Sequence, residues 1–214
     1  MSNYPFSFNT KKEPPIVSVA EHYDLLIDEG NDPVIDPPVL SEYMNRWDGD
    51  LFLDLLELDS TKSVLEIGCG TGRLAVKVAP KVGLFTGIDI SPKTVSVAKT
   101  HIHLENSRLV CGDFLKFSFK EKFDVIYSSL TFMHIENKQK SIEKISKLLN
   151  NNGICVISLD KTQNDFLDYS SRQIKIFPDN PDQILKLLRD FGFSETEKHE
   201  TDFAYIIKAK YLNR

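Results

Sequence analysis

The stretch VLEIGCGTGRL, residues 64–74, joins a short apolar run to a loop with glycines at alternate positions. Residues 64–67 have the pattern of a buried strand, and a helical pattern begins near Arg73. A glycine-rich loop between a strand and a helix lets the backbone approach a ligand at the carboxyl edge of a parallel sheet. The stretch therefore predicts an α/β fold with a ligand site at this loop.

The alternation of apolar runs and helical segments continues beyond this loop. It is typical of βαβ units and of a parallel sheet covered on both faces. Two later strand candidates, at about 193–200 and 202–211, have no helix between them, so we expect an antiparallel ending. The predicted fold is a Rossmann-like, doubly wound sheet of seven strands, mostly parallel, with an antiparallel C-terminal strand. The five earlier runs are 63–68, 82–90, 107–113, 123–129 and 154–160.

Several helices have clear boundary signals. Ser91 and Asn180 are each followed by proline, which predicts an N-cap residue and a proline at the first helical position. Residues 137–153 have an amphipathic pattern, in which Ile142 and Ile145 face the core. The helical piece at 72–80 is expected to end at Pro80.

The N-terminal quarter has a different character. Residues 1–15 are polar and contain prolines, which predicts a flexible arm. Residues 16–60 predict a helical lid or substrate segment. Val19, Tyr23, Leu26 and Ile27 share one helical face, and Leu51, Leu55 and Leu58 are aligned further on. Residues 61–214 then form the ligand-binding part, and we expect one structural domain overall.

Composition narrows the class of protein. The formal net charge is −5, which gives no electrostatic footprint for nucleic acid. Three scattered cysteines predict a reducing compartment and neither a disulfide framework nor a metal cluster. The chain shows no secretory signal and no apolar run long enough to span a bilayer, so we expect a cytoplasmic protein. No pattern indicates an oligomeric state.

The glycine loop can be tested against the two common phosphate-binding patterns. A P-loop requires Lys followed by Ser or Thr after its last glycine, whereas Arg73 and Leu74 follow Gly72. A dinucleotide fingerprint requires a third glycine where Arg73 stands, and a long side chain there obstructs close packing of helix on strand. Both phosphate interpretations are therefore disfavoured, although a nicotinamide-dependent oxidoreductase remains a formal alternative.

The stretch VLEIGCGTGRLA resembles the first motif of class I S-adenosylmethionine (SAM)-dependent methyltransferases, and further motifs follow in the family's order. They resemble the small-molecule branch known as type 11, and the resemblance covers about residues 60–212. Five motifs in the correct order are much more specific than one. The later segments are GIDIS at 87–91, CGDF at 111–114, FDVIYSSLTFMHI at 123–135, LLNNNGICVIS at 148–158 and NPDQILKLLRDFGF at 180–193.

The resemblance implies a role for individual residues around SAM. Glu66 is expected to hold the ammonium group, Asp89 the two ribose hydroxyls and Asp113 the adenine amino group, through charge-assisted hydrogen bonds. Cys69 is expected to contribute backbone only, and Ser128 to line the cleft beneath the sulfonium. The full set expected at the cofactor is Tyr23, Glu66, Gly68, Cys69, Gly70, Asp89, Ile90, Asp113, Phe114 and Ser128.

The acceptor side carries no family motif. The resemblance implies direct methyl transfer to a small molecule, without a metal. His134 is a candidate general base, and packing is the competing interpretation. SSLT at 128–131 replaces the motif of amino-directed nucleic-acid methyltransferases. Methylation of a macromolecule and SAM binding without catalysis remain open alternatives, and the acceptor itself cannot be identified from sequence.

Overall fold

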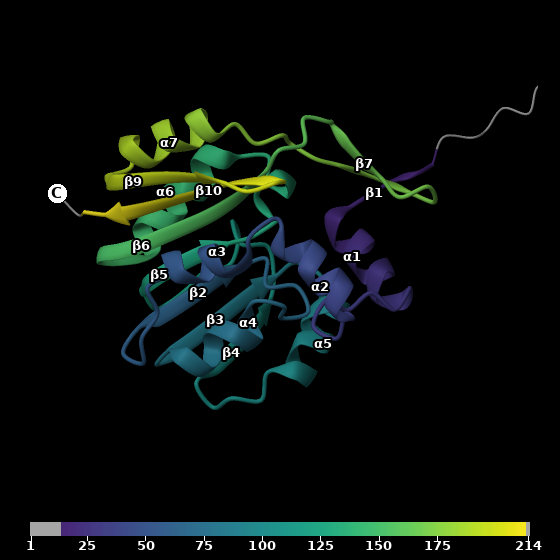
Figure 1. Cartoon of the computed structure of the whole chain (residues 1–214), viewed down its shortest axis with the longest axis horizontal. Helices are drawn as coiled ribbons and strands as arrows, with labels where there is room; N and C mark the ends of the chain where they lie inside the picture. The colour runs from purple at the N-terminus through teal and green to yellow at the C-terminus, as the bar shows by residue number, and fades with distance from the viewer. Residues whose placement is uncertain (1–13, 213–214) are drawn as a thin grey trace, which may run out of the picture.

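The computed structural model describes residues 14–212, and its centre is a seven-stranded sheet (Figure 1). The strand order is β4-β3-β2-β5-β6-β10-β9. The strands are β2 (Ser63–Ile67), β3 (Leu84–Asp89), β4 (Ser107–Cys111), β5 (Phe123–Ser128), β6 (Leu149–Asp160), β9 (Phe193–Glu200) and β10 (Ala204–Tyr211).

The pairing of these strands confirms the predicted architecture. β2 pairs in parallel with β3 on one side and with β5 on the other, and β6 continues in parallel beyond β5. β10 is antiparallel to β6, and β9 is antiparallel to β10. The chain moves outward from β2 to β4 and then returns to β5. The carboxyl ends of β2 and β5 therefore flank the topological switch point, where open α/β sheets bind ligands.

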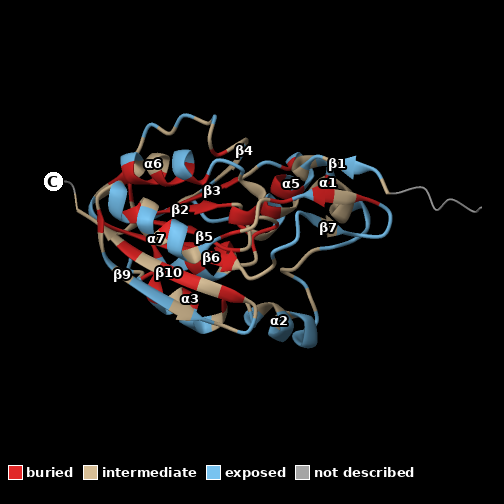
Figure 2. Cartoon of the chain, turned by 90° about the horizontal axis from the view of Figure 1, so that it is seen from above, coloured by how far each residue is buried: buried red, intermediate tan, exposed pale blue. Residues whose placement is uncertain are grey.

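Helices cover both faces of the sheet because alternate strand residues point to opposite sides. On one face α3 (Gly49–Leu55) and α4 (Ala75–Val78) pack with Val64 and Tyr127. On the other, α6 (Lys138–Leu148) and α7 (Pro181–Asp190) pack with Leu65 and Ile126. Figure 2 shows the strands between them as largely buried. The remaining helical elements of this part are α5 (Pro92–His101), η1 (Ala79–Lys81) and η2 (Phe132–His134).

The predicted helix boundaries hold where capping residues specify them. The Ser91 hydroxyl accepts from the Thr94 N–H at the start of α5, and the Asn180 side chain accepts from two backbone N–H groups of α7. In contrast, the helical piece predicted at 72–80 is only the short α4 and a following 3₁₀ turn. The predicted alignment of Leu51 is wrong. Leu51 is 40% exposed, and its neighbour Phe52 is fully buried, because a separate helix begins after Asp48.

A small second sheet lies beside the first helix and was not predicted. β1 (Ile16–Val17) pairs in parallel with β8 (Gln173–Lys175), which pairs antiparallel with β7 (Phe166–Asp168). These strands lie near α1 (Val19–Asp28), whereas α2 (Pro38–Asn45) lies apart from them (Figures 1 and 2).

The predicted arm, residues 1–15, falls mainly outside the described residues. At its described end the Pro15 carbonyl accepts from the Gln173 N–H, so this position is fixed on β8. No helix among residues 14–212 is both long enough and apolar enough to cross a bilayer.

Candidate functional site

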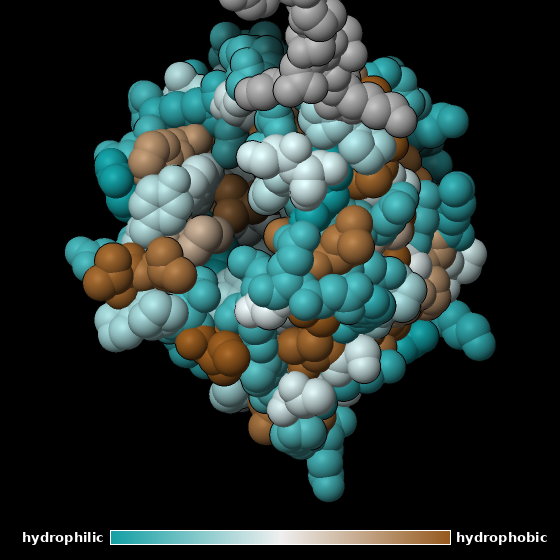
Figure 3. Space-filling view, turned by 90° about the vertical axis from the view of Figure 1, so that its right-hand side faces the viewer, coloured by the Kyte–Doolittle hydropathy of each residue, from teal (hydrophilic) through white to brown (hydrophobic). Residues whose placement is uncertain are grey.

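A cavity of about 690 Å³ lies at the carboxyl ends of the central strands. Its lining comes from the loops after β2, β3, β4 and β5 and from the end of β6, together with α1, the segment before α2, α2 itself and the β7 region. Figure 3 faces the side of the molecule where α1 and β7 lie and shows a hollow with brown, hydrophobic atoms at its bottom. The cavity therefore has a floor from the sheet and a cover from the N-terminal helices and the small sheet.

The glycine loop forms one wall of the cavity, and two of its glycines have different reasons to be glycine. Gly68 has φ +76°, and a Cβ there would lie 2.0 Å from the Thr131 hydroxyl oxygen, so the loop after β5 packs directly on it. Gly70 has φ +55°, and no atom would lie within 4 Å of an added Cβ. The space beside Gly70 opens into the cavity, which it lines.

Asp89 ends β3 beside this loop. Its carboxylate accepts hydrogen bonds from the backbone N–H of Gly70 and of Ser91, each at 3.0 Å. Burial raises the pKa of Asp89 above its usual value, and these hydrogen bonds only partly oppose the effect. The carboxylate is thus held in place by backbone donors at the rim of the cavity.

The segment after β4 supplies the next group of predicted residues. Asp113, Phe114 and Ile90 all line the cavity. One oxygen of Asp113 accepts from the Leu115 N–H at 2.8 Å, which fixes the turn. Lys144 of α6 also secures this turn, because its ammonium donates to the carbonyls of Phe114 and Phe117. This anchoring role of Lys144 was not predicted from the sequence.

Glu66 is the most perturbed acid of the cavity. Its side chain is buried, and the hydroxyl of Tyr127 donates to it at 2.9 Å. Burial raises the pKa of Glu66 to about 8, and the Tyr127 hydrogen bond opposes this only in part. Without a cation beside it, the carboxyl group therefore keeps its proton at neutral pH.

Ser128 does not lie where it was predicted. Its side chain is fully buried, its hydroxyl donates to the Ile67 carbonyl at 3.0 Å, and it does not line the cavity. The next residue, Ser129, lines the cavity instead. The prediction was wrong by one residue because Ser128 is still in β5, where the side chains alternate between the two faces. Cys69 lines the wall with a buried side chain whose pKa burial raises well above the usual value.

A buried ion pair behind the glycine loop was not predicted. Arg73 donates to both carboxylate oxygens of Asp48, and Ser129 donates to the same carboxylate at 2.6 Å. Burial alone raises the pKa of Asp48, but the Arg73 hydrogen bonds and charge outweigh it, so the pKa is lower than usual. The pair ties the entrance of α3 to the loops after β2 and β5. A carboxylate at the start of a helix was the only sequence signal for it.

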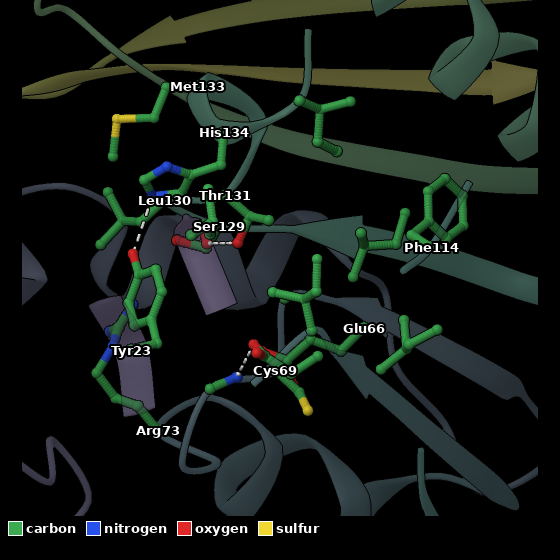
Figure 4. A pocket seen from close by; sticks show the side chains of 18 of the residues that line it. Tyr23, Glu66, Cys69, Arg73, Phe114, Ser129, Leu130, Thr131, Met133 and His134 are labelled. Atoms are coloured by element: carbon green, nitrogen blue, oxygen red, sulfur yellow. Dashed lines mark hydrogen bonds between the residues drawn. The ribbon is translucent and has the colours of Figure 1, made fainter. Parts of the chain in front are cut away.

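Tyr23 and His134 meet across the cavity, and both were candidates from the sequence. The Tyr23 hydroxyl and the His134 Nε2 are 2.9 Å apart, as the dashed line in Figure 4 shows. Burial lowers the pKa of His134 to about 4 and raises that of Tyr23, so both groups are neutral near pH 7. The Nδ1 atom of His134 is buried and has no hydrogen-bond partner in the described part of the chain.

A second contact holds the cover together. Arg172, beside β8, donates to His22 Nδ1 at 2.9 Å and makes a bidentate pair with Glu29 of α1. Tyr169 packs against the His22 ring, with centroids 4.3 Å apart. Burial lowers the pKa of His22 to about 4, with Arg172 contributing in the same direction. His22 is the buried residue of α1, whereas the sequence pattern emphasised Val19, Tyr23 and Leu26.

Comparison with known proteins identifies the family of this fold. A family model described as "Methyltransferase domain" matches residues 58–192. A malonyl-[acyl-carrier protein] O-methyltransferase of Priestia megaterium is 33% identical over 99 residues, covering 45% of this chain and 36% of the relative. The enzyme of the same name from Acetivibrio thermocellus is 26% identical over 177 residues, covering 72% of this chain and 62% of the relative. The matches thus span about one to two thirds of these relatives' lengths.

A solved structure shares the fold at low sequence identity. The N-methyltransferase NodS of Bradyrhizobium japonicum, in complex with S-adenosylhomocysteine, superposes with a TM-score of 0.67 at 21% identity. The superposition covers 89% of this chain and 98% of that one. The strand order, the glycine loop at the switch point and the matched family model agree, and the chain belongs to the class I SAM-dependent methyltransferases.

Proposed function

We propose that this protein is a SAM-dependent methyltransferase that acts on a small-molecule acceptor. The observation that carries the proposal is the arrangement of three carboxyl groups around the glycine loop. Glu66, Asp89 and Asp113 come from β2, from the end of β3 and from just after β4, and all three line one cavity. Membership of the methyltransferase family supports the same activity.

These residues fit SAM better than a phosphate ligand. The ligand has an ammonium group, two ribose hydroxyls and an adenine amino group, all of them donors, and the three carboxyl groups are acceptors when ionised. Glu66 would ionise on receiving the ammonium, because a neighbouring positive charge lowers the pKa of an acid. Asp89 would receive the ribose and Asp113 the adenine amino group, with Phe114 and Ile90 against the ring. The open space beside Gly70 leaves room for this ligand.

When bound, SAM supplies an electrophilic methyl group on a sulfonium. The work of this chain is to orient and enclose the acceptor, since direct displacement depends on alignment, and positioning of this kind contributes on the order of 7–11 kcal/mol. The cover formed by α1 and the small sheet, held by Arg172 and Glu29, would exclude water. Neutral His134, hydrogen-bonded to Tyr23, is the candidate to accept a proton from the acceptor.

A small acceptor is supported by the cavity volume of about 690 Å³ and by the lining residues that α1 and the β7 region contribute to it. The three cysteines are unpaired, which supports a reducing location such as the cytoplasm. Methylation of a macromolecule and SAM binding without catalysis remain the competing functions. Neither has a specific observation in its favour.

A comparison of SAM, S-adenosylhomocysteine and NAD by thermal unfolding tests the proposal. A ligand at 100 times its dissociation constant stabilises a protein by about 2.7 kcal/mol, so SAM and S-adenosylhomocysteine are expected to raise the melting temperature and NAD is not. A panel of small acceptors, assayed for S-adenosylhomocysteine release, then tests catalysis. Stabilisation by NAD alone would overturn the proposal, and SAM binding without turnover of any acceptor would favour a binding module.

A further inference from the structure

The lining residues not assigned to SAM include a second set of carboxylates. Asp36 lies in the segment before α2, Glu136 follows η2, and Asp160 ends β6; all three line the cavity. None of them forms an ion pair with another residue between positions 14 and 212, although Asp160 accepts hydrogen bonds from Trp47 Nε1 and the Thr162 N–H. Their charges therefore remain available to a ligand.

Positive charge is almost missing from the described lining. The single cationic side chain there is Arg73, and both of its terminal nitrogens donate to the buried carboxylate of Asp48. His134, the other basic lining residue, is neutral at physiological pH because burial lowers its pKa to about 4. An anionic acceptor would have to leave water for a site with three carboxylates and no free cation, which is costly.

Aromatic faces accompany the carboxylates. Tyr23, Trp47 and Tyr169 line the cavity, and the indole N–H of Trp47 is 2.8 Å from an oxygen of Asp160. The electron-rich faces of such rings attract organic cations, and more strongly where water is excluded. The unpartnered Nδ1 of His134, on another wall, offers a hydrogen-bond acceptor to an N–H donor in the tautomer where Nε2 carries the proton.

We propose that the methyl acceptor is an amine that enters the cavity as an organic ammonium and is held by Asp36, Glu136 and Asp160 among these aromatic side chains. The inference rests on the proposed methyltransferase function and narrows its substrate class. It differs from transfer to a carboxylate, for which the described lining provides no counter-ion.

The chemistry of an amine acceptor balances without a further reagent. The bound ammonium first loses one proton, which the unpartnered Nδ1 of His134 accepts and passes on to water, and this frees the nitrogen lone pair. The lone pair then forms the N–C bond while the C–S bond breaks. The electron pair of the C–S bond stays on sulfur, which becomes a neutral thioether. The positive charge of the sulfonium passes to the methylated nitrogen, so the carboxylates that hold the substrate also hold the product.

A matched pair of probes tests this assignment directly. The protein is saturated with S-adenosylhomocysteine and titrated calorimetrically with 2-phenylethylammonium and with 3-phenylpropionate, which have similar size and opposite charge. We expect the ammonium to bind at least about tenfold more tightly. Equal binding, tighter binding of the carboxylate, or no measurable binding of either probe would overturn the inference.

Two variants locate the preference. Asp160→Asn and Asp36→Asn keep side-chain shape and remove a charge, so each is expected to lower the affinity for the ammonium and leave that for the carboxylate unchanged or higher. Asp50→Asn, an exposed position on α3 outside the lining, removes the same charge and should change neither. A preference that survives in both cavity variants would contradict the proposal. Failure of S-adenosylhomocysteine to bind at all would instead reject the underlying methyltransferase function.

Discussion

The two halves of the cavity differ in how they are built. The half around the glycine loop is made of strand ends and tight turns, in which backbone donors fix the side chains, as Gly70 and Ser91 do for Asp89. The half opposite is made of α1, the segment before α2 and the β7–β8 region, held together by side chains distant in sequence, such as Arg172 and Glu29. A short sequence motif can encode the first kind of wall, because its contacts are local. It cannot encode the second.

The largest expected effect concerns the buried pair behind the glycine loop, in the half that is built from strand ends and turns. Asp48→Ala leaves the Arg73 guanidinium without its partner in a buried site, which costs about 3–5 kcal/mol of unfolding free energy. Urea denaturation measures this loss, and Asp50→Ala, on the same helix but exposed, serves as the control. A loss below about 1 kcal/mol would mean that the pair does not hold the α3 entrance to the sheet loops.

The next effect concerns Glu66, in the half of the cavity around the glycine loop. Its pKa is raised to about 8 in the folded state from 4.5, so the folded protein binds more protons and wild-type stability falls as pH rises through this window. Glu66→Gln removes this loss and keeps an acceptor for Tyr127. We expect the variant to be more stable than wild type at pH 8, by on the order of a few kcal/mol, and equal to it near pH 4.

The control for this comparison is Glu105→Gln at an exposed position, for which no pH-dependent difference is expected. In wild type, SAM binding should also release protons near pH 7, measurable by calorimetry in buffers of different ionisation enthalpy. A stability difference between Glu66→Gln and wild type that does not change with pH would contradict a protonated Glu66 in the folded protein.

A smaller effect is expected where the halves meet. Tyr23→Phe removes the hydroxyl that pairs with His134 Nε2 and leaves a buried nitrogen unsatisfied, at a cost of about 1–3 kcal/mol. Equilibrium denaturation measures the change, and methyl transfer should slow once an acceptor is known. Tyr43→Phe, at an exposed position of α2, is the matched control. Wild-type stability and activity in Tyr23→Phe would show that the contact has no role.

The smallest effect is a loosening, in acid, of the half made of α1, the segment before α2 and the β7–β8 region, which we call the acceptor half. His22 and His134 have pKa values lowered from 6.5 to about 4, so the unfolded state binds more protons and stability is lost as pH falls from 6.5 towards 4. Hydrogen exchange, corrected for the intrinsic pH dependence, should show protection in α1 and β8 falling on the order of tenfold by pH 5. Protection in β2 and β3 should change less. An equal loss of protection in all four elements would contradict this difference between the two halves.

The features that the sequence predicts correctly are those that neighbouring residues specify. The parallel part of the sheet follows from the βαβ alternation, and the caps at Ser91 and Asn180 fix two helices. Nine of the ten residues expected at the cofactor line the cavity, and whether they contact SAM stays a prediction. Ser128 failed because a one-residue shift in a strand moves a side chain to the opposite face.

The remaining features depend on long-range contacts. The pairing of β1 with β8 joins residues about 157 positions apart, so neither short strand has a hydrophobic period of its own. Arg172, His22 and Asp48 carry ordinary polar side chains in unremarkable sequence contexts, and only the fold shows that they are buried. Sequence motifs therefore could not predict the acceptor half, because the contacts that hold it together join residues far apart in the chain.

The most direct test of the central claim is a calorimetric titration of SAM into wild type and Asp89→Ala. Asp89 lines the cavity at the end of β3, and loss of one charge-assisted pair to the ribose is expected to weaken binding by at least about tenfold. Asp89→Asn keeps the side-chain shape and an acceptor for one of the Gly70 and Ser91 N–H groups, so it disturbs the loop less than Asp89→Ala while removing the charge, and it should also bind more weakly. Unchanged SAM affinity in both variants, or no SAM binding by wild type, would contradict the assignment of this cavity.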